Sequence, residues 1–370
     1  MNLLDFFRKA LRQQGLMPFV EFMHHALYAP NLGYYNSSSQ KFGASGDFVT
    51  APELTPLFGQ TLANQCLQVL SALNDPILFE FGAGSGQLCV DILTQLDSQD
   101  ALPREYHILE VSAHLQARQR ALIIEKMPHL QHRIKWLSAW PTTPFEGVMI
   151  ANEVLDAMPV HRFLQTSDGL MESYITLNSK DELQEVFQPS VNAALIAHVK
   201  TILSSHQAPY QSEANLFLDD WFRQSAAILD RGAMFILDYG FPRHEYYHSD
   251  RREGTLMCHY RHHAHPFPLL HLGEQDITAH VDFTHVAEAA HAAGFHVAGY
   301  TNQASFLLAN GLLSLLDQMP DDRLKMNTQQ AVKKLLHPSE MGELFKVIAL
   351  TKPAEWALTG FQLRDLRASL

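Results

Sequence analysis

The segment Ile77–Asp91, ILFEFGAGSGQLCVD, constrains the fold of this 370-residue chain more than any other stretch. An apolar run of strand length leads into Gly82, Gly84 and Gly86, and a helical pattern follows from Gln87. Glycine permits the sharp turn and the close approach of backbone to a ligand that begin a βαβ nucleotide-binding unit. The segment therefore predicts a buried parallel strand, a ligand-binding turn and a helix.

The residues around these glycines indicate which nucleotide the turn would hold. Their spacing differs from the dinucleotide pattern G-x-G-x-x-G. Glu80 precedes the glycines and would repel a pyrophosphate, but it suits the sulfonium cation of S-adenosylmethionine, which carries no phosphate. Glu110 ends the next apolar strand, at the spacing expected for an acceptor of ribose hydroxyls. The alternatives are a glycine-rich turn in another α/β protein and, for Glu110, a solvated acid that opens a helix.

Composition limits the class of protein. With 46% hydrophobic and 18% charged residues, the chain can bury a large core, in one large domain with additions or in two domains. The formal net charge of -12 argues against nucleic acid as a partner. Three cysteines without metal-type spacing suit a reducing compartment. Since no apolar run reaches the roughly 18 residues that span a bilayer, we expect a cytoplasmic protein without membrane insertion.

Strand-like and helix-like patterns alternate from Ile77 to about Ala151 and resume near residue 216, which is typical of a doubly wound, mostly parallel α/β sheet. Between them, two strand-like runs flank a Ser167-Asp168-Gly169 turn and predict a hairpin. We expect four segments: an N-terminal helical extension and lid at 1–75, the first half of the core at 76–156, an inserted hairpin and helical subdomain at 157–215, and the second half of the core at 216–370 with an insertion at 240–282.

Seven stretches, spread over nearly the whole chain, form a distinctive set. They are YAPNLGYYN at 28–36, GDFVTAPELTPLFGQ at 46–60, FEFGAGSGQL at 79–88, ANEVLDAMPVHRF at 151–163, DYGFPRHEYYH at 238–248, GTLMCHYRHH at 254–263 and DITAHVDF at 276–283. Together they resemble the MidA-like class I methyltransferases, which include the mitochondrial complex I assembly methyltransferases. The resemblance implies a Rossmann-like, seven-stranded sheet, S-adenosyl-L-methionine as cofactor, and methyl transfer to arginine of a protein substrate such as a respiratory complex subunit.

Asn152, Glu153 and Asp156 lie at the end of the predicted strand GVMIAN, at the edge where doubly wound sheets bind their ligands. A guanidinium presents paired donors that carboxylates bind bidentately, so these residues would align a nitrogen with the methyl group. If a helix starts here, Glu153 and Asp156 share one of its faces. We interpret the three as catalytic. The alternative is that Glu153 complements a helix N-terminus and Asp156 caps the segment before Pro159.

The remaining cofactor contacts are predicted from position. Asp47 and Thr50 lie in GDFVTAPELTP, which we interpret as a lid, although a turn former and a helix cap explain the two residues equally well. Many such methyltransferases hold the adenine amine with an acid after the third strand. This chain has LSAWP there, so Ser138 or backbone near Trp140 would take that role.

The histidine-rich stretch 259–271 lacks the spacing of a zinc site, and we expect a polar loop without a metal. Two further functions stay open beside protein arginine methylation: methylation of oxygen or nitrogen in a small molecule, and a non-catalytic cofactor-binding assembly factor. The insertions, which would form a wide cleft, favour a protein acceptor. A homodimer is compatible with the sequence.

Overall fold

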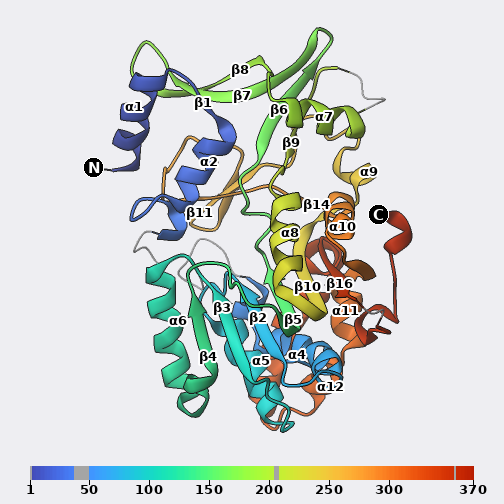
Figure 1. The fold of residues 1–370 in the computed structure, drawn as a ribbon. Coiled ribbons are helices and arrows are strands. Elements are labelled where there is room, and N and C mark those ends of the chain that lie inside the picture. The colour runs from blue at the N-terminus through green and yellow to red at the C-terminus, as the bar shows by residue number, and fades with distance from the viewer. Residues whose placement is uncertain (1, 37–49, 204–207, 354–355) are drawn as a thin grey trace. The chain divides into compact units, whose positions relative to one another are not determined.

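The computed structural model describes residues 2–36, 50–203, 208–353 and 356–370 (Figure 1). They form two compact units, each made of three segments of the chain. Unit 1 consists of Met1–Phe48, Asp156–Leu218 and Pro242–Asp282, and unit 2 of Val49–Leu155, Asp219–Phe241 and Phe283–Leu370. Unit 1 thus combines N-terminal residues with two segments that interrupt the chain of unit 2. The four-segment division expected above stays a prediction.

Unit 2 contains the larger sheet, whose main path has the strand order β15-β16-β10-β5-β2-β3-β4. Strand β2 lies between β3 and β5, and these pairs, like β3 with β4 and β5 with β10, are parallel. Strand β16 runs antiparallel to both β10 and β15. The strands are β2 (Ile77–Phe81), β3 (Glu105–Leu109), β4 (Ile134–Leu137), β5 (Phe145–Asn152), β10 (Leu229–Phe241), β15 (His296–Asn302) and β16 (Phe345–Lys352). The seven strands of this path and their mostly parallel pairing confirm the predicted fold class.

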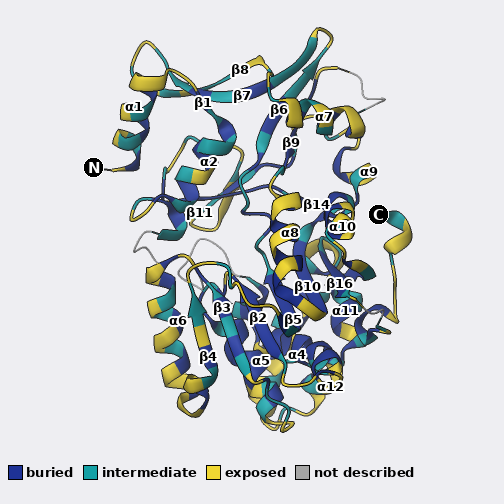
Figure 2. Ribbon diagram, in the orientation of Figure 1, coloured by how far each residue is buried: buried dark blue, intermediate teal, exposed yellow. Residues whose placement is uncertain are grey.

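Helices alternate with the strands of unit 2 and bury the sheet. All five residues of β2 are buried, as expected for a parallel strand covered on both faces, and Figure 2 shows β2, β5 and β10 as mainly buried. The helices are α3 (Ala51–Leu54), α4 (Pro56–Leu70), α5 (Gln87–Asp97), α6 (Ala113–Lys126), α8 (Leu218–Ile228), α10 (Phe283–Ala292), α11 (Gln303–Ala309), α12 (Leu312–Asp317) and α13 (Asp322–Leu336). Shorter helical turns span Pro128–Arg133, Pro338–Gly342, Thr359–Phe361 and Arg367–Ser369.

Unit 1 contains two smaller sheets. The first has the order β1-β7-β6-β9, with β8 paired to β7, and the second has the order β12-β11-β13. The antiparallel pairing of β6 with β7, closed at Thr166 and Gly169, confirms the predicted hairpin. The strands of these two sheets are β1 (Met17–Pro18), β6 (His161–Thr166), β7 (Gly169–Leu177), β8 (Leu183–Pro189), β9 (Tyr210–Ala214), β11 (Met257–Tyr260), β12 (His263–His265) and β13 (Asp276–Thr278). The short strand β14 (Val281–Asp282) belongs to neither of them.

The helices of unit 1 are α1 (Leu3–Gln14), α2 (Phe19–Tyr28), α7 (Ala193–Ile202) and α9 (Arg243–Tyr246), with a helical turn at Tyr34–Asn36. Helices α1 and α2 pack through buried apolar side chains, including Phe7, Phe22 and Leu27. In the part of the chain that the structure describes, no helix combines the length and the apolarity needed to cross a membrane.

Candidate functional site

The glycine turn joins β2 to α5. Gly82, Gly84 and Gly86 have φ angles of 59°, 53° and 89°, a left-handed backbone that side-chain-bearing residues rarely adopt. The N–H of Gly82 donates to the carbonyl of Leu109 at 3.0 Å, and this bond ties the turn to the end of β3. Gly82 is exposed whereas Gly86 is buried. The turn therefore presents open backbone at its first glycine, as cofactor binding at this position requires.

Glu110 follows β3 directly and is only 5% exposed. One carboxylate oxygen, Oε1, accepts the N–H of Ser112 at 2.9 Å, and the other, Oε2, accepts the side-chain amide of Gln119 at 3.2 Å. Burial raises the pKa of Glu110, while the donors from Ser112 and Gln119 lower it. The alternative of a solvated acid is therefore wrong, and Ser112, whose Oγ accepts the N–H of Leu115, caps α6.

A carboxylate has about four lone-pair sites, so Glu110 retains capacity to accept ribose hydroxyls beside these donors. Together with the open backbone at Gly82, this capacity means that the residues present fit an adenosine-containing cofactor. The sulfonium and the amino-acid tail of such a cofactor need different partners, and Glu80 was the predicted one.

Glu80 lies within β2 and is 2% exposed. The hydroxyl of Tyr106 on β3 donates to its Oε2 at 2.8 Å. Burial raises the pKa of Glu80 to about 7, the hydrogen bond from Tyr106 lowers it, and the charge of Glu110 raises it. The structure thus places Glu80 in the core beside Tyr106, and its predicted role toward a cationic ligand stays a prediction.

Asn152 is the last residue of β5, and Glu153 begins the turn that follows. Glu153 has a φ of 51°, in the left-handed region, and its N–H donates to the carbonyl of Leu237 on β10 at 2.9 Å. The side-chain amide of Asn152 donates to Oε1 of Glu153 at 3.3 Å. Oδ2 of Asp238, also on β10, accepts the N–H groups of Val154 and Leu155 at 3.2 and 2.9 Å. The bonds to β10 therefore determine the backbone of this turn.

No helix starts at Glu153, so the expectation that Glu153 and Asp156 share a helix face is wrong. The physical reason lies in the backbone, because the φ of 51° at Glu153 is outside the right-handed helical region. The turn also lies against the glycine turn, because a Cβ placed on Gly82 would be 3.7 Å from Cγ2 of Val154. Asn152 and Glu153 are both partly exposed.

Asp156 begins a segment of unit 1 and is 5% exposed. Its carbonyl accepts the N–H of Ala279 at 3.0 Å. In the same unit the hydroxyl of Tyr35 donates to both carboxylate oxygens of Asp276, at 3.0 and 2.9 Å. Burial raises the pKa of Tyr35 well above its usual value, and the charges of Asp276 and Asp156 raise it further. Asp156 therefore belongs with a group of tyrosine and aspartate side chains in which the two aspartates are buried and Tyr35 is partly buried.

The other predicted contacts lie as follows. Asp47 lies outside the described residues. Thr50 occupies the N-cap position of α3, but its side chain makes no capping hydrogen bond. Ser138 is exposed after β4. Nearby, the ring of Trp140 lies 5.4 Å from that of Phe81, so this tryptophan packs against the end of β2. The cofactor roles of these residues stay predictions.

Sequence reasoning missed Gln119 and Tyr106, the side chains that contact Glu110 and Glu80. A signal for Gln119 exists in hindsight, since it occupies the buried face of α6 between Leu115 and Ile123, at helical spacing. A glutamine in such a place needs hydrogen-bond partners. Tyr106 carries no comparable signal, because tyrosine is common in strands.

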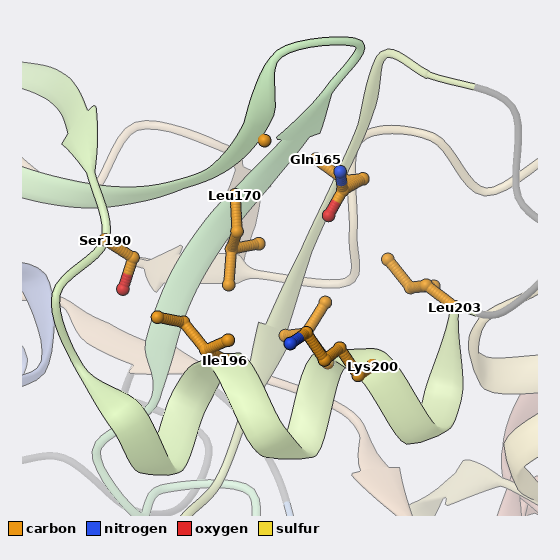
Figure 3. Close-up of a pocket in the computed structure, with 8 residues that line it drawn as sticks. Gln165, Leu170, Ser190, Ile196, Lys200 and Leu203 are labelled. Atoms are coloured by element: carbon orange, nitrogen blue, oxygen red, sulfur yellow. The ribbon is translucent and has the colours of Figure 1, made fainter.

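A cavity of about 400 Å³ lies in unit 1 between α7 and the hairpin strands β6 and β7 (Figure 3). Its lining residues are Gln165, Gly169, Leu170, Ser190, Ile196, Val199, Lys200 and Leu203. This lining includes none of the predicted site residues that the structure describes. In the whole part of the chain that the structure describes, no group of three or more His, Cys, Asp or Glu side chains is arranged to hold a metal ion.

Comparisons with known proteins bear on the glycine turn and its surroundings. Residues 61–301 match the model of a family described as S-adenosyl-L-methionine-dependent methyltransferases. The mitochondrial protein arginine methyltransferase NDUFAF7 homolog of Drosophila melanogaster is 29% identical over 378 residues, covering 93% of this chain and 83% of the relative. Human protein arginine methyltransferase NDUFAF7, also mitochondrial, is 28% identical over 372 residues, covering 92% and 81%.

A solved structure adds a bound ligand to this comparison. The crystal structure of a Burkholderia thailandensis protein bound to S-adenosyl-homocysteine is 41% identical in sequence and has a TM-score of 0.95. The match covers 100% of this chain and 96% of that chain. The described fold is therefore shared with a protein that holds the demethylated form of S-adenosylmethionine.

Proposed function

Since the chain belongs to the family of S-adenosyl-L-methionine-dependent methyltransferases, we propose that it methylates arginine side chains of a protein. The names of the Drosophila and human relatives support an arginine acceptor. The observation that carries the proposal is the turn at Glu153. At this turn Glu153 is partly exposed and its backbone N–H is bonded to β10, while the neighbouring Val154 lies beside Gly82 of the glycine turn.

The chain's own residues divide the work between cofactor and acceptor. When bound, S-adenosyl-L-methionine supplies an electrophilic methyl group. Glu110 accepts ribose hydroxyls, and the glycine turn lets the backbone approach the cofactor closely. Glu153 accepts paired donors of the guanidinium and orients one nitrogen, while the Asn152 amide steadies its carboxylate. Rate enhancement then comes mainly from proximity and alignment.

The acceptor class is tested by methyl transfer from labelled cofactor to a cell lysate, resolved by size. Label in one protein band, released as methylarginine on acid hydrolysis, supports the proposal. Label only in small molecules supports the small-molecule alternative and overturns the proposal of a protein acceptor. No label, combined with measurable binding of S-adenosyl-homocysteine, supports the non-catalytic assembly factor instead.

The proposed acceptor is a protein. From the family resemblance, we propose that this protein is a subunit of a respiratory complex. The names of the relatives include the word mitochondrial and lend no support to the cytoplasmic localisation expected from composition, which stays a proposal. A homodimer likewise stays a proposal.

A further inference from the structure

Gln119 is a fully buried polar side chain with three hydrogen bonds to three different elements. Its Nε2 donates to the carbonyl of Gly84 in the glycine turn at 3.0 Å, and to Oε2 of Glu110 at 3.2 Å. Its Oε1 accepts the indole N–H of Trp136 on β4 at 3.0 Å. One side chain of α6 thus joins the glycine turn, the acid after β3 and the adjacent strand.

The chemistry of Trp136 determines how the Gln119 amide is oriented. An indole N–H can only donate, so the oxygen of the amide must face Trp136. Both amide hydrogens are then left for Gly84 and Glu110. The guanidinium of Arg120 lies 3.9 Å from the centre of the Trp136 ring, and this cation–π contact helps to hold the indole in place.

Gln119 also packs closely against Gly86 of the glycine turn. A Cβ placed on Gly86 would lie 3.3 Å from Cα and Cγ of Gln119, tighter than ordinary van der Waals contact. The glycine at this position therefore lets α6 approach the turn closely enough for the amide to reach the carbonyl of Gly84. The sequence pattern explains why a glycine is needed at position 86 for the turn. The structure shows a second reason, which is the close approach of α6.

We propose that Gln119 is a positioning residue for the cofactor, which holds the Glu110 carboxylate ionised and in register with the glycine turn so that it meets the ribose hydroxyls. The proposal rests on cofactor binding and on the role of Glu110. It does not depend on arginine as the acceptor, so it stands or falls separately from that part of the proposed function.

Electrostatics gives this role a measurable signature. Burial raises the pKa of Glu110, and the Gln119 amide is one of the donors that lower it again. An ionised carboxylate accepts hydrogen bonds from both ribose hydroxyls, whereas protonation removes acceptor capacity. Removing the amide raises the pKa of Glu110 further. The loss of cofactor affinity on acidification then begins at a higher pH in the variant. Glu80, whose pKa burial and the charge of Glu110 raise to about 7, titrates in the same range, so the shift is measured as a difference between proteins that all retain Glu80.

The test is the affinity for S-adenosyl-homocysteine, measured by isothermal titration calorimetry between pH 5 and 8. Gln119→Met keeps the length of the side chain and removes both donors. We expect binding about 10-fold to 100-fold weaker, as for lost hydrogen bonds to a charged group, and a pH profile shifted upward. The matched control is Gln116→Met on the same helix. Gln116 donates to the main-chain oxygen of Glu110 at 2.7 Å, so its loss should change affinity by less than about threefold and leave the profile in place.

A double-mutant cycle separates positioning from general support of the fold. If Gln119 acts through the carboxylate, Gln119→Met costs little more affinity once Glu110→Gln is present. Trp136→Phe retains an aromatic ring but removes the donor that orients the amide, and it should shift the pH profile in the same direction by a smaller amount. Additive losses in the cycle, or an unchanged profile in both the Gln119→Met and Trp136→Phe variants, overturn the proposal.

Discussion

Glu110 and Glu153 occupy equivalent backbone positions on opposite sides of β2, yet the structure holds them in different ways. Each directly follows a strand that pairs with β2. The N–H of Glu110 donates to Leu137 of the next strand outward, and the N–H of Glu153 donates to Leu237 of the next strand on its own side, both at 2.9 Å. The two acids thus end the same kind of parallel ladder.

Their carboxylates differ. That of Glu110 is buried and accepts donors from Ser112 and Gln119. Glu153 is partly exposed, its Oε1 accepts the side-chain amide of Asn152 at 3.3 Å, and its backbone is left-handed, with a φ of 51°. Such a backbone costs about 1–3 kcal/mol and persists only where the surroundings enforce it. We infer that hydrogen bonds to the carboxylate of Glu110 pre-organise this acid for the cofactor. Glu153, in contrast, is positioned for the proposed methyl acceptor mainly by its constrained backbone.

The largest expected effect comes from Glu153→Gln. The substitution keeps the size of the side chain and removes the charge that would pair with a guanidinium, so methyl transfer should fall by about 100-fold to 1,000-fold. The affinity for S-adenosyl-homocysteine should stay nearly unchanged, measured by calorimetry alongside the transfer assay. Glu125→Gln, an exposed acid on α6, is the matched control. Equal losses of transfer and binding would assign Glu153 to the cofactor and remove the contrast with Glu110.

Glu80→Gln tests the buried side of the comparison through the pH dependence of stability. Burial raises the pKa of Glu80 from 4.5 to about 7. Between these values the folded protein binds more protons than the unfolded chain, so the free energy of unfolding falls as pH rises and levels off above about pH 7.

This shift corresponds to about 3 kcal/mol. Urea titrations at pH 5 and pH 8 should show a smaller fall in the Glu80→Gln variant than in the wild type. Part of the fall remains, because burial also raises the pKa of Asp91 to about 7. An identical fall in both proteins would mean that Glu80 titrates near its ordinary value despite its burial.

The part of the site formed by the glycine turn and Glu110 was largely predictable, because its signals are local in sequence. The apolar run before Gly82, the glycine spacing and the strand that ends at Glu110 all depend on residues close together in the chain. Strand β2 and helix α5 therefore lie where the pattern predicted them. The partner of Glu110 was missed, because Gln119 is recognisable only once α6 packs against the glycine turn.

The turn at Glu153, where the methyl acceptor is proposed to bind, was less predictable. The position of Asn152 and Glu153 after a strand was predicted, but the conformation of the turn was not. The local pattern allowed a helix to start here. In the structure, the carboxylate that accepts two N–H groups of the turn belongs to Asp238, which lies 84 residues from Val154 in the chain. Contacts of such separation form only when β5 and β10 pair, and they override local preference.

Asp238→Ala is expected to weaken the turn at Glu153. It leaves the N–H groups of Val154 and Leu155 without their carboxylate acceptor, which should lower the free energy of unfolding by about 2 kcal/mol. Asp238→Asn keeps one side-chain oxygen as an acceptor and should cost about half as much or less. Urea denaturation measures both, and the transfer assay should decline in the same order. A larger loss in the Asn variant than in the Ala variant would contradict this account of the turn, because asparagine retains an acceptor that alanine lacks.

The smallest expected effect isolates the strain at Glu153. Glycine adopts a φ of 51° freely, so Glu153→Gly relieves the strain of the left-handed backbone while it loosens the unfolded chain. Relative to Glu153→Gln, which retains the strain, the glycine variant should be more stable by about 0.5–1 kcal/mol in urea denaturation. Methyl transfer should be strongly reduced in both variants. Glu110→Gly serves as the control at the equivalent position after β3. It removes a buried, hydrogen-bonded side chain and relieves no left-handed backbone, so it should destabilise the protein. If glycine destabilises both positions alike, backbone strain does not distinguish the two acids.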